Sequence, residues 1–194
     1  MKRLLDVVGA VILLGVFCVP MLLIAFAIWS TTGYPIFFSQ LRKGHQGKLF
    51  RIWKFRTMTV ADQDCSTRDL AWHHQDFRVT PIGSMLRRTH LDELPQLWNV
   101  LIGEMSLVGP RPLVPSIAQE MEKQFPWAVD RFLVKPGLTG PVQVFGRRVL
   151  QGDPEYCCRL DIEYATMNNQ WQWLARDLQI LWATVFVVLS ANGI

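Results

Sequence analysis

The sequence predicts a small, mainly helical α+β domain that lies on a membrane and carries an N-terminal re-entrant anchor of helix, break and helix. Three observations predict this fold class. The chain has 194 residues, of which 50% are hydrophobic and only 19% charged, enough for one domain and an additional apolar segment. No charged residue or histidine occurs from Val7 to Leu41. An ordinary soluble composition follows, so we expect an anchor over residues 1–41 and a domain over residues 42–194.

The apolar segment has the length of a membrane helix and the flanks of a re-entrant one. Val7 to Ile28 would span about 33 Å as a helix, close to the bilayer core of about 30 Å. Pro20 lies inside it and predicts a kink. Lys2 and Arg3 precede it, and six lysines and arginines between residues 42 and 56 follow it, so both flanks favour the cytoplasm. A signal peptide is the competing interpretation, but the run is too long and no small-x-small cleavage site follows.

A strand and a helix are expected next. Lys48 to Phe55 alternates apolar and polar residues, which predicts a short strand. Residues 60–77 are polar and predict a loop or short helix. Between Leu91 and Leu101 apolar residues recur at spacings of three and four, typical of an amphipathic helix. Because Pro95 is tolerated in a first turn and not in an interior, this helix should begin near Asp92.

Two stiff loops and two further helices complete the expected fold. Gly109 to Pro112 and Lys135 to Pro141 are rich in glycine and proline and predict loops. Ser116 to Phe125 predicts a helix between them. The tail from Leu174 to Leu189 is apolar but contains two charged residues, with tryptophans within and just before it. This pattern favours an amphipathic helix at the membrane interface over a second span.

Composition excludes several classes of function. The net charge of +4 gives no strong attraction to nucleic acid, so no nucleic-acid partner is expected. The four cysteines show neither CxxC spacing nor the density of a disulfide scaffold, which favours a reducing compartment. The four histidines form no HExxH pattern, and no phosphate-binding loop, dinucleotide fingerprint or nucleophile elbow occurs.

An acidic pair is the first candidate for chemistry. Asp92 and Glu93 would stand at the N-terminus of the helix expected there. Two adjacent carboxylates can supply a nucleophile or base and a ligand for a hard cation. The alternative is a helix whose first turn carries favourable acids. The pair alone does not decide between these interpretations.

Arginines beside glycine and proline form the second candidate group. Arg87 and Arg88 precede the acidic pair, Arg111 lies in the first stiff loop, and Arg147 and Arg148 follow the second. Guanidinium groups on stiff loops suit phosphate oxygens, although any one of them can be a solvated surface charge.

A basic segment follows the expected strand, from Lys54 to Arg56. It would contact an anion of the substrate or the acidic lipid headgroups, and both interpretations stay open. Spacing alone thus predicts a membrane-surface protein with an acidic pair and a Mg²⁺-assisted phosphate site.

Several longer motifs resemble one family. They are RRTHLDELPQLWNVLIGEMSLVGPRPL (residues 87–113), KRLLD before the apolar segment, KFRTM (54–58), KPGLTGPVQVFGR (135–147), and Leu160-Asp161 with Tyr164. They resemble the bacterial sugar transferases, the monotopic polyprenol-phosphate phosphoglycosyl transferases, over nearly the whole chain. The resemblance implies a re-entrant anchor on the cytoplasmic face of the bacterial inner membrane. The break is typically Ser-Pro in that family and is Val19-Pro20 here.

The resemblance also implies a reaction. A sugar 1-phosphate would pass from a UDP-sugar to a polyprenol phosphate such as undecaprenyl phosphate, releasing UMP with Mg²⁺ as cofactor, as the first membrane step of glycoconjugate assembly. Asp92 would be the nucleophile of a covalent phosphosugar intermediate, and Glu93 with Asp92 would hold the metal. A homo-oligomer is compatible with this interpretation, and no motif names the sugar. Two rivals stay open: a Mg²⁺-dependent hydrolase of lipid or nucleotide phosphates, and a membrane-docked scaffold without activity.

Substrate-binding residues follow from the same resemblance. The expected phosphate contacts are Arg87, Arg111 and Arg147. The weaker candidates, for substrate binding or support of the site, are Lys54, Arg56 and Asp161.

Overall fold

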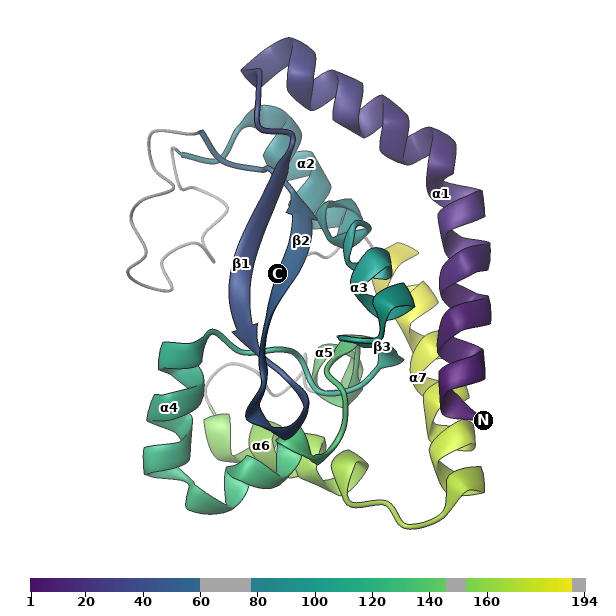
Figure 1. Cartoon of the computed structure of the whole chain (residues 1–194), viewed down its shortest axis with the longest axis vertical. Helices are drawn as coiled ribbons and strands as arrows, with labels where there is room; N and C mark the ends of the chain where they lie inside the picture. Colours follow the sequence, from purple (N-terminus) through teal and green to yellow (C-terminus); the bar gives the residue numbers. More distant parts are fainter. Residues whose placement is uncertain (60–77, 146–152, 190–194) are drawn as a thin grey trace.

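The computed structural model describes residues 1–59, 78–145 and 153–189. Within these ranges the chain is a mainly helical α+β fold with two two-stranded sheets (Figure 1). The predicted fold class is confirmed in this form, together with a long apolar helix at the N-terminus. Re-entry of that helix into a membrane stays a prediction. The loop expected at residues 60–77 lies outside the described residues.

Helix α1 (Lys2–Thr32) runs along the right-hand side and the top of Figure 1. Its two halves point in different directions, and Pro20 lies inside the helix, in keeping with the hydrogen bond that a proline removes. The helix continues through this bend without interruption. By length and composition it could cross a membrane. Its buried residues are Asp6, Ala10, Ile24 and Ile28.

Strands β1 (Phe37–Lys43) and β2 (Leu49–Phe55) form an antiparallel hairpin, closed by the 3₁₀ turn η1 (His45–Gly47). Strand β2 confirms the predicted strand and buries Phe50 and Ile52, on a side that contacts α3. Strand β1 is not among the predicted elements, because its first residues continue the uncharged run. It crosses residue 41, where the sequence places the end of the anchor.

The acidic pair lies between two helices. Helix α2 (Pro81–Thr89) is followed by the 3₁₀ turn η4 (Leu91–Glu93) and helix α3 (Gln96–Ile102). The predicted start of the helix at Asp92 is therefore wrong. The amides of Glu93 and Leu94 donate to carbonyls three residues back, as in a 3₁₀ turn. Pro95 has no N–H to extend this pattern, and α3 begins after it.

The two glycine-proline loops lie against each other. Strand β3 (Ser106–Val108) pairs in parallel with β4 (Gly137–Thr139), which lies within the second loop, so a loop without strand is a correction to the sequence prediction. A Cβ on Gly109 would approach the Lys135 carbonyl oxygen to 2.4 Å. Only glycine permits this contact. Helix α4 (Pro115–Gln124) confirms the predicted helix, and η5 (Pro126–Leu133) and α5 (Pro141–Phe145) follow.

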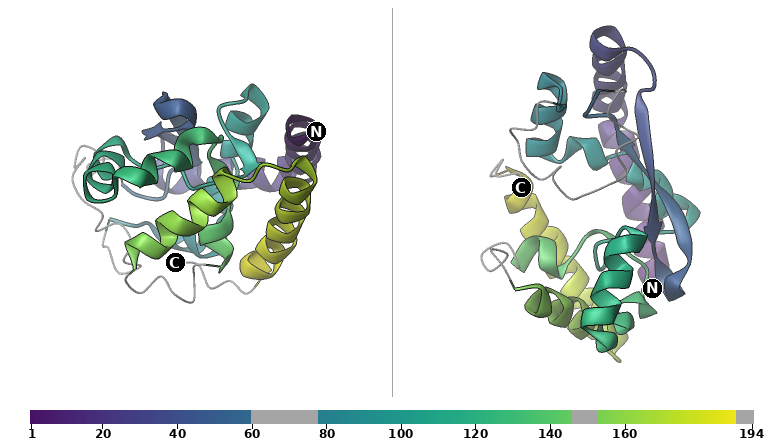
Figure 2. Two further views of the ribbon diagram at one scale, coloured as in Figure 1. Left: turned by 90° about the horizontal axis from the view of Figure 1, so that it is seen from below. Right: turned by 90° about the vertical axis from the view of Figure 1, so that its left-hand side faces the viewer.

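Helices α6 (Pro154–Ala165) and α7 (Gln170–Leu189) close the described fold. Helix α7 confirms the predicted C-terminal helix and lies beside the N-terminal part of α1 (Figure 2). Lys2 donates to Asp177 of α7 at 2.6 Å, and Asp6 accepts hydrogen bonds from the side chain of Ser106 and the amide of Leu107. The start of α1 is therefore fixed to the domain by polar contacts. The main core is made by Leu97, Val100, Met105, Tyr164 and Ile180, among others.

Candidate active site

The acidic pair stands at the centre of a cluster of charges. Asp92 and Glu93 are only 7% and 9% exposed. Glu93 Oε1 accepts hydrogen bonds from Lys54 Nζ at 2.6 Å and from Arg111 Nη2 at 2.8 Å. Lys54 comes from β2 and Arg111 from the loop after β3, so segments distant in sequence meet on η4. Lys54 Nζ is 3.9 Å from Asp92 Oδ2, which is an ion-pair distance but not a hydrogen bond.

The two carboxylates differ in their electrostatics. Burial raises the pKa of Asp92 to about 6, assisted by the charge of Glu93 and opposed by the charges of Lys54, Arg87 and Arg111. Burial also disfavours ionised Glu93, but the charges and hydrogen bonds of Arg111 and Lys54 outweigh it and lower the Glu93 pKa. In return, Glu93 raises the pKa of Arg111 against the effect of its burial. Different pKa values in one acidic pair are a sign of different chemical roles.

Arg87 approaches the same pair from the last turn of α2. Its Nε donates to Thr57 Oγ1 at 3.0 Å, and its positive charge lowers the pKa of Asp92. Its neighbour Arg88 is exposed. Of the predicted site residues, the structure thus brings together Asp92, Glu93, Lys54, Arg87 and Arg111.

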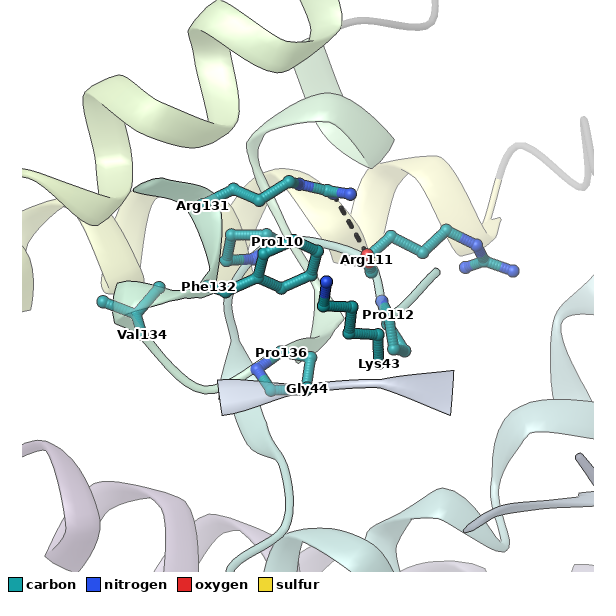
Figure 3. Close-up of a pocket in the computed structure, with 9 residues that line it drawn as sticks. All are labelled: Lys43, Gly44, Pro110, Arg111, Pro112, Arg131, Phe132, Val134 and Pro136. Atoms are coloured by element: carbon teal, nitrogen blue, oxygen red, sulfur yellow. Dashed lines mark hydrogen bonds between the residues drawn. The ribbon is translucent and has the colours of Figure 1, made fainter. Parts of the chain in front are cut away.

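The loop that carries Arg111 lies on a closely packed group of side chains (Figure 3). Arg131 Nη2 donates to the Arg111 carbonyl oxygen at 3.1 Å. Two prolines of the loop, Phe132 and the aliphatic part of Lys43 fill the space around it, and the remaining cavity measures about 10 Å³. That volume is at the lower limit for one water molecule. These side chains therefore support the loop and do not form a ligand pocket.

Two other predicted residues lie elsewhere in the described structure. Arg56 is 2% exposed and donates to the carbonyl oxygens of Thr32, Gly33 and Tyr34, so it caps the end of α1. Asp161 pairs with Arg131 beneath the loop. Arg147, with Arg148, lies outside the described residues.

Sequence reasoning missed Thr57 and Arg131. Thr57 lies inside the KFRTM motif, directly after the candidate residue Arg56, and that position was an available signal. Arg131 lies in η5 within no quoted motif. No pattern indicated that its side chain is buried under the Arg111 loop.

The donor set of the pair suits a hard divalent cation. In the described ranges no group of three or more His, Cys, Asp or Glu side chains gathers. Mg²⁺ is typically held by one or two carboxylates and completes its shell with water and substrate phosphates. Asp92 and Glu93, with oxygen donors and two adjacent cations for phosphate, fit that requirement.

Comparison with known proteins identifies the family. The family model described as bacterial sugar transferase matches residues 1–191. The chain belongs to the bacterial sugar transferase family. All the described elements, including α1 and the η4 acidic pair, fall within the matched residues.

Three relatives of this sugar transferase differ in length and in name. The chain is 38% identical over 187 residues to the UDP-glucose:undecaprenyl-phosphate glucose-1-phosphate transferase of Klebsiella pneumoniae, covering 95% of this chain and 39% of that protein. It is 40% identical over 195 residues to the uncharacterized sugar transferase EpsL of Bacillus subtilis, covering 100% and 90%. It is 32% identical over 192 residues to the UDP-N-acetylgalactosamine-undecaprenyl-phosphate N-acetylgalactosaminephosphotransferase of Aeromonas hydrophila, covering 99% and 44%. The chain spans less than half the length of the Klebsiella and Aeromonas relatives.

Proposed function

We propose that this chain transfers a sugar 1-phosphate from a UDP-sugar to a polyprenol phosphate, giving a polyprenol diphosphate sugar and UMP. One observation carries the proposal: an acidic pair in a single 3₁₀ turn whose members have opposite pKa shifts beside lysine and arginine side chains. The names of the Klebsiella and Aeromonas relatives support the choice of substrates. They name different sugars, so we propose the donor class and not one sugar.

The two carboxylates have different roles in this proposal. Glu93 is bonded to Lys54 and Arg111 and stays ionised, which makes it a fixed negative charge rather than a nucleophile. Asp92 has a pKa of about 6 and is therefore mostly ionised at neutral pH. Its carboxylate is not held in a hydrogen bond by Lys54 at 3.9 Å. Asp92 is thus the member of the pair that is free to attack.

The reaction proceeds in two displacements. An Asp92 carboxylate oxygen attacks the sugar-bearing phosphorus, and the bond from that phosphorus to the bridging oxygen breaks, so that UMP leaves with the electron pair. A phosphate oxygen of the polyprenol phosphate then attacks the same phosphorus and breaks its bond to Asp92, which restores the carboxylate. Arg111, Arg87 and Lys54 would bind the phosphate oxygens, because phosphoryl transfer depends mainly on positioning and charge stabilisation.

Asp92 and Glu93 would also hold Mg²⁺. When bound, the ion supplies neutralisation of the diphosphate charge and of the leaving UMP. The family resemblance and the oxygen donors of the pair support this cofactor. We therefore expect chelation to abolish transfer and Mg²⁺ to restore it.

The site is proposed to work at the cytoplasmic face of the bacterial inner membrane. Helix α1 exposes a series of large apolar side chains, including Ile12, Val16 and Leu23, and α7 exposes Trp182 and Phe186. Burying such surface in lipid is favourable. A helix that re-enters the bilayer at its Pro20 bend would hold the pair near the headgroups, where the phosphate of the lipid acceptor lies. These exposed apolar side chains are also compatible with a homo-oligomer.

The test is a donor panel. Purified protein in nanodiscs is incubated with Mg²⁺, undecaprenyl phosphate and UDP-linked glucose, galactose, N-acetylglucosamine or N-acetylgalactosamine, while UMP release is followed. We expect one donor to release UMP. With that donor and no acceptor, intact mass should show a phosphosugar adduct on the protein that is absent from Asp92→Asn and present in Asp130→Asn, which changes an exposed acid.

The rival functions give different results in the same assay. Free sugar phosphate released without acceptor would indicate the hydrolase. No binding of any UDP-sugar with Mg²⁺ by a folded, membrane-bound protein would indicate the scaffold.

A further inference from the structure

A buried ion pair lies beneath the Arg111 loop. Arg131 of η5 and Asp161 of α6 are 5% and 3% exposed, and Arg131 Nη2 donates to Asp161 Oδ2. The same nitrogen donates to the Arg111 carbonyl oxygen at 3.1 Å (Figure 3). The pair therefore joins α6 to the loop through one guanidinium group.

The pair is poorly explained by stability alone. In the described part of the chain, Arg131 Nε and Asp161 Oδ1 are buried without a hydrogen-bond partner. Burying two charges costs solvation, and apolar residues of similar volume often serve the fold equally well. A buried pair with unsatisfied atoms is better understood as a device that specifies one local geometry.

The geometry that it specifies is that of the Arg111 loop. The carbonyl oxygens of Pro110 and Leu113 accept hydrogen bonds from the backbone amides of Gly137 and Lys43. Between them, the Arg111 carbonyl oxygen accepts from a side chain, that of Arg131. On the other side of the same residue, the Arg111 guanidinium donates to Glu93 at 2.8 Å.

We propose that Arg131, oriented by Asp161, is a positioning residue that fixes the Arg111 backbone and so keeps the Arg111 guanidinium on Glu93 for the transfer. This inference rests on the proposed function. Neither residue of the pair touches the reacting atoms. The proposed effect on transfer runs through Arg111, and this makes the inference testable against a purely structural role.

The test removes both charges at once. Arg131→Met alone leaves the Asp161 charge buried and should lower the melting temperature. Arg131→Met with Asp161→Leu removes the pair, and we expect melting close to that of the wild type. UMP release should nevertheless fall at least about tenfold in this double variant, because displacements of about 1 Å in a site are costly. Wild-type turnover in a well-folded double variant would overturn the proposal.

A double-mutant cycle separates positioning from folding. In an Arg111→Ala background there is no guanidinium left to position, so removing the pair should cost no more than about twofold further. Equal losses in both backgrounds would mean that the pair acts through the fold, against the proposal. If the double variant does not fold, Arg131→Lys takes its place in the cycle, because one ammonium group keeps the charge but lacks the planar fork.

A readout without substrate keeps this test independent of the reaction. The ¹⁵N side-chain signals of Arg111, assigned by their loss in Arg111→Ala, should show restricted rotation in the wild type and free rotation once the pair is removed. Unchanged signals would contradict the inference whatever the activity. If no donor releases UMP from the wild type, the proposed function fails while this measurement still decides the role of Arg131.

Discussion

Two clusters around buried carboxylates each place a lysine 2.6 Å from an acidic oxygen, and they differ in how their charges are balanced. The base cluster consists of Lys2, Tyr164 and Asp177. Asp177 accepts from Lys2 on one oxygen and from the Tyr164 hydroxyl on the other. Burial, followed by the charge of Asp177, raises the pKa of Tyr164, so the phenol keeps its proton and continues to donate. One positive charge meets one negative charge, and both oxygens of the acid are occupied.

The site cluster consists of Lys54, Asp92, Glu93 and Arg111. Both cations donate to one oxygen of Glu93, and the second carboxylate stands 3.9 Å from Lys54. Similar residue types thus give two different results. At the start of α1 both oxygens of Asp177 accept hydrogen bonds, whereas on η4 Asp92 is not hydrogen-bonded to Lys54. The comparison favours a structural role for the first cluster, and the second is the site for which we propose chemistry.

The largest expected effect comes from a substitution in the site cluster. Asp92→Asn keeps the shape of the side chain and removes the carboxylate that we propose as the nucleophile, so UMP release should fall at least about 10³-fold, roughly 4 kcal/mol in activation free energy. The free energy of unfolding should not fall. Steady-state UMP release and urea unfolding on the same preparation measure both quantities. Activity within tenfold of the wild type would remove Asp92 from the role of nucleophile.

The next largest effect comes from a substitution in the base cluster. Asp177→Asn leaves the Lys2 ammonium group without its counter-charge, and the free energy of unfolding should fall by about 3 kcal/mol. Activity per folded molecule should change far less than in Asp92→Asn. Glu163→Gln, which alters an exposed acid on α6, is the matched control and should stay within about 0.5 kcal/mol. A stable Asp177→Asn protein would show that the base cluster does not support the fold.

The sequence predicted the elements with clear periodicity and the residues with clear motifs. Strand β2, helices α4 and α7 and the acidic pair followed from local pattern. The 3₁₀ turn at Asp92 did not, because helical spacing does not distinguish a helix from a short turn that precedes it. Strand β1 was hidden by the uncharged run that it shares with α1, and β4 by the glycine and proline around it.

Long-range contacts were the part that sequence could not supply. Lys54, Arg87 and Arg111 were candidates on local grounds, but their meeting at η4 depends on how three segments pack. Arg56 and Lys54 were equally good candidates on local sequence grounds, yet Arg56 binds the end of α1. The Arg131–Asp161 pair joins two residues 30 positions apart in sequence, and only the fold shows that it lies under the loop.

A smaller effect concerns the pH dependence of the site cluster. Because the folded protein raises the pKa of Asp92 from 3.8 to about 6, folding favours its protonated form. That contribution to stability is present below pH 4 and lost as the pH rises through 6. The wild type should therefore lose about 2 kcal/mol relative to Asp92→Asn between pH 4 and pH 7. Unfolding of both metal-free proteins across this range measures the difference, and parallel curves would contradict the shift.

The smallest effect tests the support of Arg87. Thr57→Val keeps the shape of the side chain and removes the acceptor of the Arg87 Nε hydrogen bond. Losing one such bond costs about 1 kcal/mol, or about fivefold in UMP release. Arg88→Ala, at the exposed neighbouring position, should change the rate less than twofold because surface substitutions away from a site have little effect. Equal effects of the two variants would mean that the Thr57 hydrogen bond does not position Arg87 for the reaction. A selective loss in Thr57→Val would instead extend the site cluster to a third cation, held in place by a neutral hydroxyl as Tyr164 holds Asp177.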